Sequence, residues 1–527
     1  MNGNLSRRRF LGLVGAAGGA TAIYQASRAM GLLPDTGQPA SLQLAQAPES
    51  GNKVAILGAG LAGLAIAYEL ERVGYDCTII EASGRVGGRV LTMRHGDKVD
   101  EMGYEQVCNF DDDPHLYFNC GAARIAGHHH RVLHYCRELG VPLEIMANDN
   151  AEAWTHDANA FGGNPVRVRE FRTDARGFLS ELLFKAVDRN EFEKPLSEED
   201  RLRMLEFARA YGELNEEARY VGSKRAGFGQ NTDGFSNPGL LKDPLNLSDI
   251  LQSDFWQSRM HFNEDENWAA PLMTPTGGMD AIPRSFVRNI KSPILLNAQV
   301  QSIELRDRGV DVDYNHKGER RQLRADYCFN SIPVHFIEGI NNNFPRTYAK
   351  TIAAMERNNF GKIGLQMKTR FWEHENIYGG ITFTNQRINQ IWYPSHGIHR
   401  EKGVVLGCYT FGEDQTEFFE RMTPDERIRF AGEAGDRIHK GYSDQIESGV
   451  SVMWGRMKHM MGCGSGFRTP EEWEKLFPIV QKPQGRHYMV GDQISYHPTW
   501  QEGAFSSVEF ALQDLDRRVR KNASARG

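Results

Sequence analysis

The stretch that decides the fold is KVAILGAGLAGLAIAYELERVGYDCTIIEASGRVGGR, residues 53–89. A short apolar run typical of a buried strand leads into Gly58, Gly60 and Gly63, spaced G-x-G-x-x-G, and a helical pattern follows. A second apolar run ends at Glu81, at the distance of about 20 residues where an acid meets an adenosine ribose. This order predicts a βαβ unit whose helix N-terminus binds the pyrophosphate of a dinucleotide.

Each glycine of this turn has a predicted role. Gly58 permits the tight turn, Gly60 lets the phosphates approach the backbone, and Gly63 lets helix and strand pack closely. Two arginines and three glycines follow in residues 84–89, GRVGGR, where an NAD protein needs no second phosphate-contacting loop. This segment resembles the G-R-x-G-G-R loop of the flavin amine oxidase superfamily, and the resemblance implies FAD.

Other segments resemble further motifs of the same superfamily. They are the acid-x-Gly segment 99–103, the Gly-Gly-Met-Asp turn in 275–280, the crossing 330–333 and the C-terminal motif in 488–505, where Asp492 replaces the usual Glu. The context of Cys463 differs from that of the covalent flavin cysteine of monoamine oxidases, so we expect noncovalent FAD. The cofactor-binding positions that the resemblance implies are Gly58, Gly60, Gly63, Glu81, Ala82, Gly87, Gly88, Arg89, Val300, Gly491, Asp492, Gly503 and Ala504.

The resemblance also implies an α/β (α+β) architecture. A Rossmann-type FAD-binding domain is expected to interleave with a mixed-sheet substrate domain and a helical insertion. The predicted divisions are 51–115, 276–345 and 450–527 for the FAD-binding domain, 116–150, 255–275 and 346–449 for the substrate domain, and 151–254 for the helical subdomain. Polar residues 306–309 predict a hairpin turn, and Thr423 with Glu426 predicts a capping box.

Four residues carry the expectation about the substrate. Arg124, in Gly-Ala-Ala-Arg-Ile and expected to open a helix, resembles the G-x-x-R arginine that grips the α-carboxylate in L-amino acid oxidases. A guanidinium suits this task because it pairs with a carboxylate through two charge-assisted hydrogen bonds. By the same resemblance, Tyr393 shares the carboxylate, Trp500 walls the amine side, and Lys362 is the catalytic lysine that holds a water near the flavin. The alternatives are an ion-paired or surface arginine, core aromatic residues and a solvated lysine.

The resemblance therefore implies an FAD-dependent L-amino acid oxidase. Its reaction would convert an L-amino acid and O2 to a 2-oxo acid, ammonia and hydrogen peroxide. An amine or polyamine oxidase, a flavin dehydrogenase and a flavin-fold protein without catalysis are the alternatives. Family members are often dimers, so a homodimer is expected.

Bulk properties exclude several other classes. The 527 residues are 40% hydrophobic and 25% charged, and the net charge of −6 gives no reason to expect nucleic acid as a partner. Seven cysteines without a C-x-x-C pair argue against a disulfide scaffold or a structural metal. His128, His129 and His130 are consecutive and cannot converge on one ion from one helix face. His130 and His134 could converge, being four residues apart, but no third ligand accompanies them, so no metal is expected.

The N-terminus is predicted to be a targeting signal rather than part of the folded domain. Residues 6–11, SRRRFL, resemble a twin-arginine signal, which implies a periplasmic or secreted protein. The weakly apolar stretch 12–23 is shorter than a membrane span, so no stable membrane insertion is expected. Residues up to about 50 are expected to be removed or disordered. Residues 45–47, AQA, are a candidate cleavage site.

Overall fold

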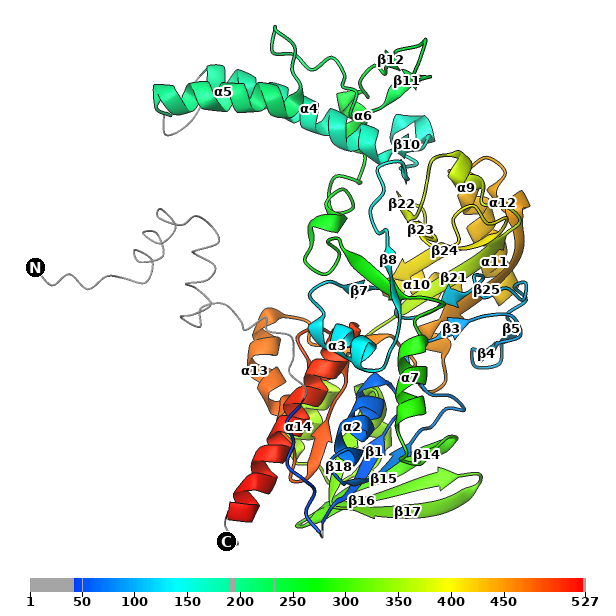
Figure 1. Cartoon of the computed structure of the whole chain (residues 1–527), viewed down its shortest axis with the longest axis vertical. Coiled ribbons are helices and arrows are strands. Elements are labelled where there is room, and N and C mark those ends of the chain that lie inside the picture. The colour runs from blue at the N-terminus through cyan, green and yellow to red at the C-terminus, as the bar shows by residue number, and fades with distance from the viewer. Residues whose placement is uncertain (1–41, 50, 190–195, 232, 525–527) are drawn as a thin grey trace, which may run out of the picture.

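The computed structural model describes residues 42–49, 51–189, 196–231 and 233–524. Figure 1 shows three tiers along the longest axis, with a sheet and helices α2 and α14 at the base and a second sheet at mid-height. Helices α4 to α6 lie at the opposite end. The mixture of helices and several sheets confirms the predicted α/β class.

The base tier is a five-stranded sheet in which every neighbouring pair is parallel. Its order is β14 (Ile294–Leu295), β2 (Asp76–Ile80), β1 (Lys53–Leu57), β18 (Tyr327–Asn330) and β27 (His487–Met489). Side chains alternate along β1, so Val54 and Ile56 face one hydrophobic core while Ala55 and Leu57 face another. The predicted βαβ unit therefore lies in the middle of the sheet and is buried on both sides.

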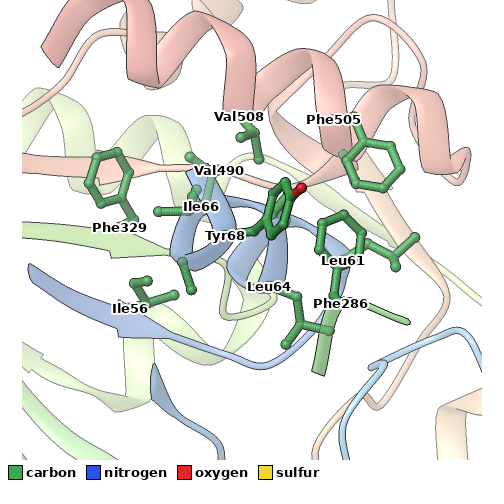
Figure 2. Close-up of a cluster of buried hydrophobic side chains, with 14 of the residues drawn as sticks. Ile56, Leu61, Leu64, Ile66, Tyr68, Phe286, Phe329, Val490, Phe505 and Val508 are labelled. Atoms are coloured by element: carbon green, nitrogen blue, oxygen red, sulfur yellow. The ribbon is translucent and has the colours of Figure 1, made fainter. Parts of the chain in front are cut away.

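Helices cover the first of these faces. α2 (Leu61–Glu71) packs between α7 (Ala281–Asn289) and α14 (Gln501–Ser524), and Figure 2 shows Tyr68 of α2 among side chains from all three helices. The rings of Tyr68 and Phe286 pack edge to face, with their centroids 5.7 Å apart. The C-terminal helix thus completes the core that the N-terminal glycine motif begins.

A four-stranded sheet covers the second face. Its order is β17 (Glu319–Ala325), β16 (Gly309–His316), β15 (Ala298–Arg306) and β19 (Asn341–Asn342). Arg306 pairs with Gly309 in the antiparallel register, which confirms the predicted hairpin. The sequence did not predict β17, because most of its residues are charged or polar and exposed rather than alternating with apolar ones.

The middle tier is a seven-stranded mixed sheet. Its order is β10 (Val166–Arg167), β9 (Trp154–His156), β22 (Gly380–Thr384), β23 (Gln390–Tyr393), β24 (Gly403–Phe411), β21 (Phe360–Met367) and β25 (Ile446–Met453). Strands β9 and β10 belong to the segment expected to be helical from residue 151, so that expectation was wrong as far as Arg167, and the helices begin at Val168. The predicted capping box is confirmed at Thr423 and Glu426, where α11 (Pro424–Gly435) begins.

The two faces of this sheet contact different cores. One face carries Trp392 and Leu406, with Tyr409 packed beside them. The other face carries Tyr393, Val405 and other apolar residues that pack against α11. Because neighbours in a strand point to opposite faces, two adjacent aromatic residues of β23 serve different cores.

A helical arm forms the third tier. It contains α4 (Val168–Asp188), α5 (Glu198–Gly212), α6 (Leu247–Gln252) and the pair β11 (Phe228–Gln230) and β12 (Leu240–Leu241). Figure 1 places this arm at the end of the molecule opposite the base of α14. Several of its apolar side chains are exposed, namely Leu179, Leu182, Leu202, Phe207, Leu240 and Leu241.

Shorter elements complete the described chain. They are β3 (Thr92–Met93), β4 (Lys98–Asp100), β5 (Glu105–Val107), β6 (Phe118–Asn119), β7 (Ile125–Ala126), α3 (His130–Glu138), β8 (Leu143–Met146), β13 (Leu272–Pro275), α8 (Arg346–Ala353), β20 (Glu356–Asn358), α9 (Phe371–His374), α10 (Glu413–Glu420), α12 (Tyr442–Gln445), β26 (Gly464–Gly466) and α13 (Pro470–Gln481), with 3₁₀ turns η1 (Phe161–Gly163), η2 (Phe262–Glu264), η3 (Val334–Gly339), η4 (Trp454–Arg456) and η5 (Asp492–Ile494). No helix of the described ranges is both long and apolar enough to span a membrane.

Residues 42–49 pack on the folded body. Ala47 N–H donates to the carbonyl of Val73 at 2.7 Å, and Ala45 N–H donates to Asp516 at 2.7 Å. Leu42 and Leu44 pack against the core around α2. Residues up to about 50 were expected to be removed or disordered; disorder is contradicted for this stretch, because its apolar side chains pack on a core, and removal stays a prediction. The twin-arginine segment lies outside the described residues.

Candidate active site

Two adjoining cavities lie between the parallel sheet and the mixed sheet. The first encloses about 330 Å³ and runs past the glycine turn that follows β1. The second encloses about 590 Å³ and is bounded by the face of the mixed sheet that carries Trp392. The two cavities share five lining residues, namely Ala122, Cys463, Thr499, Trp500 and Gln501. A group bound in the first cavity can therefore meet a molecule bound in the second.

The glycine turn opens the first cavity to the N-terminus of α2. Gly58 has a φ of +101°, a conformation that favours glycine, and Gly60 is the N-cap of α2 with no side-chain cap. No atom lies within 4 Å of the position that a Cβ of Gly60 would take, so there is room beside the backbone. Free N–H groups at a helix N-terminus beside open space fit the pyrophosphate of a dinucleotide.

Glu81 lies at the far side of this turn and is buried. Its carboxylate accepts the N–H groups of Ala59 at 2.7 Å and Ser83 at 2.8 Å, and it lines the cavity beside Ala82. The position of Glu81 and its negative charge suit an acid that accepts a hydrogen bond from a ribose hydroxyl. Of the expected cofactor positions, Gly58, Gly60, Glu81, Ala82, Gly87, Gly88, Arg89, Val300, Gly491, Asp492 and Ala504 line the first cavity.

The two remaining glycines act by packing instead. A Cβ on Gly63 would lie 2.0 Å from the carbonyl oxygen of Gly58, and a Cβ on Gly503 would lie 2.2 Å from that of His497. Neither residue lines the first cavity. The close packing predicted for Gly63 is thereby confirmed, whereas the inclusion of Gly63 and Gly503 among the cofactor-binding positions is corrected, because both act through the close approach of backbones that shape the cavity.

Asp492 explains how the C-terminal motif joins the N-terminal one. Its carboxylate forms an ion pair with Arg89 and accepts the N–H of Thr499 at 2.8 Å. Arg89 also donates to the carbonyl of Cys463 at 3.0 Å. The aspartate, where Glu is usual in the superfamily, thus connects the loop after β2 with the approach to α14.

Some lining residues of the first cavity were not predicted. They are Gln299, Gln301, Ser331, Lys458 and His459, among others. Ser331 donates to the carbonyl of Leu57 at 2.8 Å, beside the glycine turn. Ser331 lies within the crossing segment 330–333, so this motif could have indicated that it lines the cavity. Lys458 and His459 come from a loop of the mixed-sheet tier, and no local pattern marks them.

The second cavity is largely aromatic. Its rings are Phe262, Trp268, Phe360, Phe383, Trp392, Tyr409, Phe411 and Trp500. Polar lining comes from Arg124, Arg259 and Lys362 and from uncharged side chains such as Asn389, Gln390 and Gln415. No Asp or Glu is among the described residues that line it. The cavity therefore favours a bulky apolar group and an anion over a dication.

Arg124 is buried in this cavity. It precedes β7, and α3 begins only at His130, so the expectation that it opens a helix was wrong. Its Nη1 donates to Oδ1 of Asn148 at 2.8 Å, and its Cζ lies 3.9 Å and 4.3 Å from the rings of Trp268 and Trp392. Burial lowers the pKa of Arg124 to about 9, which still leaves the guanidinium charged at pH 7.

Lys362 lies on β21, an interior strand, and is 3% exposed. Its Nζ donates to the carbonyl of Gly121 at 2.6 Å and lies 4.8 Å from the ring of Tyr409. Burial, reinforced by the charge of Arg124, lowers the pKa of Lys362 to about 7. The ammonium is therefore poised to titrate near neutrality beside the junction of the two cavities.

Tyr393 does not lie in the second cavity, so its prediction as a carboxylate ligand is corrected. Its hydroxyl pairs with His439 Nε2 at 2.6 Å and with Thr382 at 2.8 Å, on the opposite face of the sheet from Trp392. Tyr409 lines the cavity instead, close enough to Arg124 for each group to influence the pKa of the other. The prediction for Tyr393 was wrong because local sequence does not fix which face of each strand meets the cavity.

Trp500 lies where the two cavities meet. Its ring packs edge to face on His129 at 4.9 Å and against Trp268 at 4.9 Å. His128 and His129 both contact Oδ1 of Asn267, at 3.3 and 3.0 Å. Within the described ranges, no group of three or more His, Cys, Asp or Glu side chains is arranged to hold a metal.

The comparison with known proteins agrees with this geometry. The model of the flavin-containing amine oxidoreductase family matches residues 61–509, so this chain belongs to that family. YobN of Bacillus subtilis (strain 168) is 28% identical, with 88% of this chain and 94% of that protein covered. The L-amino-acid oxidase of Pseudechis australis is 26% identical, with 89% and 87% covered.

Solved structures share the fold. A cyclohexylamine oxidase from Brevibacterium oxydans IH-35A matches with a TM-score of 0.60 at 16% identity, covering 89% of this chain and all of that one (100%). A putrescine oxidase variant matches with a TM-score of 0.59 at 17% identity, covering 88% and 98%. This likeness shows the fold, and the residues that line the first cavity fit the FAD that a flavin-containing amine oxidoreductase uses.

Proposed function

We propose that this protein oxidises L-amino acids with FAD and O2, giving a 2-oxo acid, ammonia and hydrogen peroxide. The observation that carries the proposal is Arg124, a buried cation that lines the aromatic cavity and has no carboxylate partner among the described residues. A buried charge without a counter-ion is costly, and a substrate α-carboxylate would supply one. A monoamine substrate would leave the guanidinium uncompensated.

Several side chains of the second cavity together orient the substrate. Arg124 holds the carboxylate, and the Tyr409 hydroxyl donates a further hydrogen bond to it. Burial raises the pKa of Tyr409 to about 12, so the hydroxyl keeps its proton at neutral pH. Within the described residues this hydroxyl has no hydrogen-bond partner, which leaves it free for substrate. The aromatic rings exclude water and favour bulky neutral side chains.

FAD, when bound, supplies the acceptor for a hydride from the substrate Cα and passes the electrons on to O2. Trp500 lines both cavities and forms a wall for the substrate where they meet. Lys362 places a partly protonated amine at this junction, where it can hold a water or favour electron transfer to O2. These residues contribute orientation and electrostatics.

The direct test is a panel of the standard L-amino acids, read out by peroxide formation under air. Arg124→Met should lower kcat/KM for the preferred amino acid by about 100-fold or more, because a buried charge pair is lost. It should not lower turnover of the amine that the same amino acid gives on decarboxylation. Unchanged amino acid turnover in this variant would refute the proposal.

The alternatives have distinct outcomes. A polyamine oxidase would need anionic groups for its substrate, and the described lining of the second cavity offers none. A monoamine oxidase would oxidise the decarboxylated amine in preference to the amino acid. A dehydrogenase would reduce a dye without oxygen yet form little peroxide in air. A protein without catalysis would keep its flavin spectrum when an L-amino acid is added anaerobically.

We further propose that the FAD is noncovalent, that the protein is exported by the twin-arginine route, and that it forms a homodimer. Acid precipitation should release the flavin into the supernatant. Replacing Arg7 and Arg8 by lysine should leave the folded protein in the cytoplasm. The contacts of Leu42, Leu44 and Ala47 support processing before residue 42 rather than within residues 45–47. Light scattering measures the oligomeric state.

A further inference from the structure

Asn148 holds Arg124 in place. It lies in the loop after β8, is 5% exposed, and accepts from Nη1 of Arg124 at 2.8 Å. Its Nδ2 donates to the carbonyl oxygen of Trp268 at 3.2 Å. A carbonyl oxygen can only accept, so this contact fixes the amide with its own oxygen toward the guanidinium. The same amide therefore orients Arg124 and the loop that carries one of the indole rings against it.

Arg124 differs from the other buried arginines of the described chain. Arg427 pairs with Glu101, and Arg370 pairs with Glu373. Arg124 has instead a neutral amide and two indole rings. Rings attract a cation without cancelling its charge, and a neutral amide leaves that charge intact. The surroundings of Arg124 hold the cation in one geometry and leave its charge available.

We propose that Asn148 is a positioning residue that determines specificity. Its neutral amide orients Arg124 and reserves the full positive charge for the α-carboxylate of the substrate, and this inference rests on the proposed function. An aspartate at position 148 would be a built-in counter-ion that competes with the substrate carboxylate. The neutrality of residue 148 thus selects amino acids over amines.

Two substitutions of Asn148 separate the effect of an added negative charge from the effect of losing the hydrogen bonds that hold Arg124. Asn148→Asp should raise KM for L-phenylalanine by about tenfold or more, with kcat within about threefold, because the carboxylate is bound before chemistry. It should not lower kcat/KM for 2-phenylethylamine. Asn148→Ala removes both hydrogen bonds but adds no charge, so it should raise KM less than Asn148→Asp does. If Asn148 acted only by holding Arg124 through hydrogen bonds, Asn148→Ala would raise KM more than Asn148→Asp does.

Asn150→Asp is the matched control. Asn150 lies on the same loop, donates to the carbonyl of Gly379 at 2.9 Å and does not line the second cavity. The substitution loses an equivalent contact and adds the same charge away from Arg124. We expect its KM for L-phenylalanine to stay within about twofold of the wild-type value, because the added charge is partly exposed and screened. Flavin content checks that every variant is folded.

Benzoate gives a second readout without turnover. Its carboxylate should perturb the flavin absorbance when it binds, and Asn148→Asp should weaken this binding by about tenfold or more. If benzoate binds wild type and Asn148→Asp equally, the inference is overturned whatever the enzyme oxidises. If the wild type oxidises no L-amino acid yet binds benzoate in this charge-sensitive way, the proposed function fails while the role of Asn148 stands.

Discussion

At the scale of single residues, the choice between two tyrosines is testable. Tyr409→Phe should raise KM for the preferred amino acid by about tenfold, because one hydrogen bond to a charged group is lost. Tyr393→Phe should leave KM within about twofold and lower the free energy of unfolding by about 1–3 kcal/mol, because the hydroxyl pairs with His439 and Thr382 in the core. Steady-state kinetics and urea unfolding of both variants check this. The reverse pattern would restore Tyr393 as the carboxylate ligand.

Lys362 should give the reaction with oxygen a pH dependence. Its folded pKa, lowered to about 7 by burial, means that the ammonium is present below that pH and is lost as pH rises through it. The rate of flavin reoxidation by O2 should therefore fall as pH rises through about 7, and stopped-flow absorbance measures it. In Lys362→Met the reoxidation should be slower and independent of pH in this range. A profile that persists in the variant would assign the titration to another group.

At the scale of elements, Gly60 and Gly63 are required at the start of α2 for different reasons. Gly60 leaves room for a cofactor, and Gly63 lets α2 pack closely on the glycine turn. Gly60→Ala meets no atom of the protein, so the chain should fold with normal circular dichroism yet retain little FAD. Gly63→Ala places a methyl group 2.0 Å from the Gly58 carbonyl, so it should separate α2 from β1 and lower stability. The ratio of flavin to protein absorbance and the melting temperature distinguish the two effects. Full flavin in purified Gly60→Ala would contradict the placement of the pyrophosphate.

At the scale of the whole molecule, a buried ion pair joins distant segments. Arg427 of α11 pairs with Glu101, which also accepts the N–H of Met453 at 2.7 Å, and both charged residues are fully buried. Arg427→Met leaves an unpaired buried carboxylate and should lower the free energy of unfolding by about 3–5 kcal/mol. The double variant with Glu101→Gln should recover much of this loss in urea unfolding. A double variant no more stable than Arg427→Met would contradict this account.

Local sequence was sufficient for the βαβ unit and for the hairpin between β15 and β16. Gly58, Gly60, Gly63 and Glu81 act within one short segment, so spacing alone located the cofactor cavity. Residues that reach a site from distant segments were harder to find. Lys458 and Asn148 carry no local pattern. Strand β9 pairs with β22, which is distant in the sequence, and β10 pairs in turn with β9. The packing of residues 42–49 likewise depends on apolar surface supplied by α2 and α14.

The sequence by itself determined the dinucleotide turn, the α/β class and the superfamily, because those depend on backbone conformations that neighbouring residues dictate. Tertiary structure alone decided which side chains share the substrate cavity. It placed Tyr409 rather than Tyr393 beside Arg124, since alternate residues of a strand face opposite cores. It also placed a neutral amide and two indole rings in contact with Arg124, and such contacts come from segments far apart in the chain.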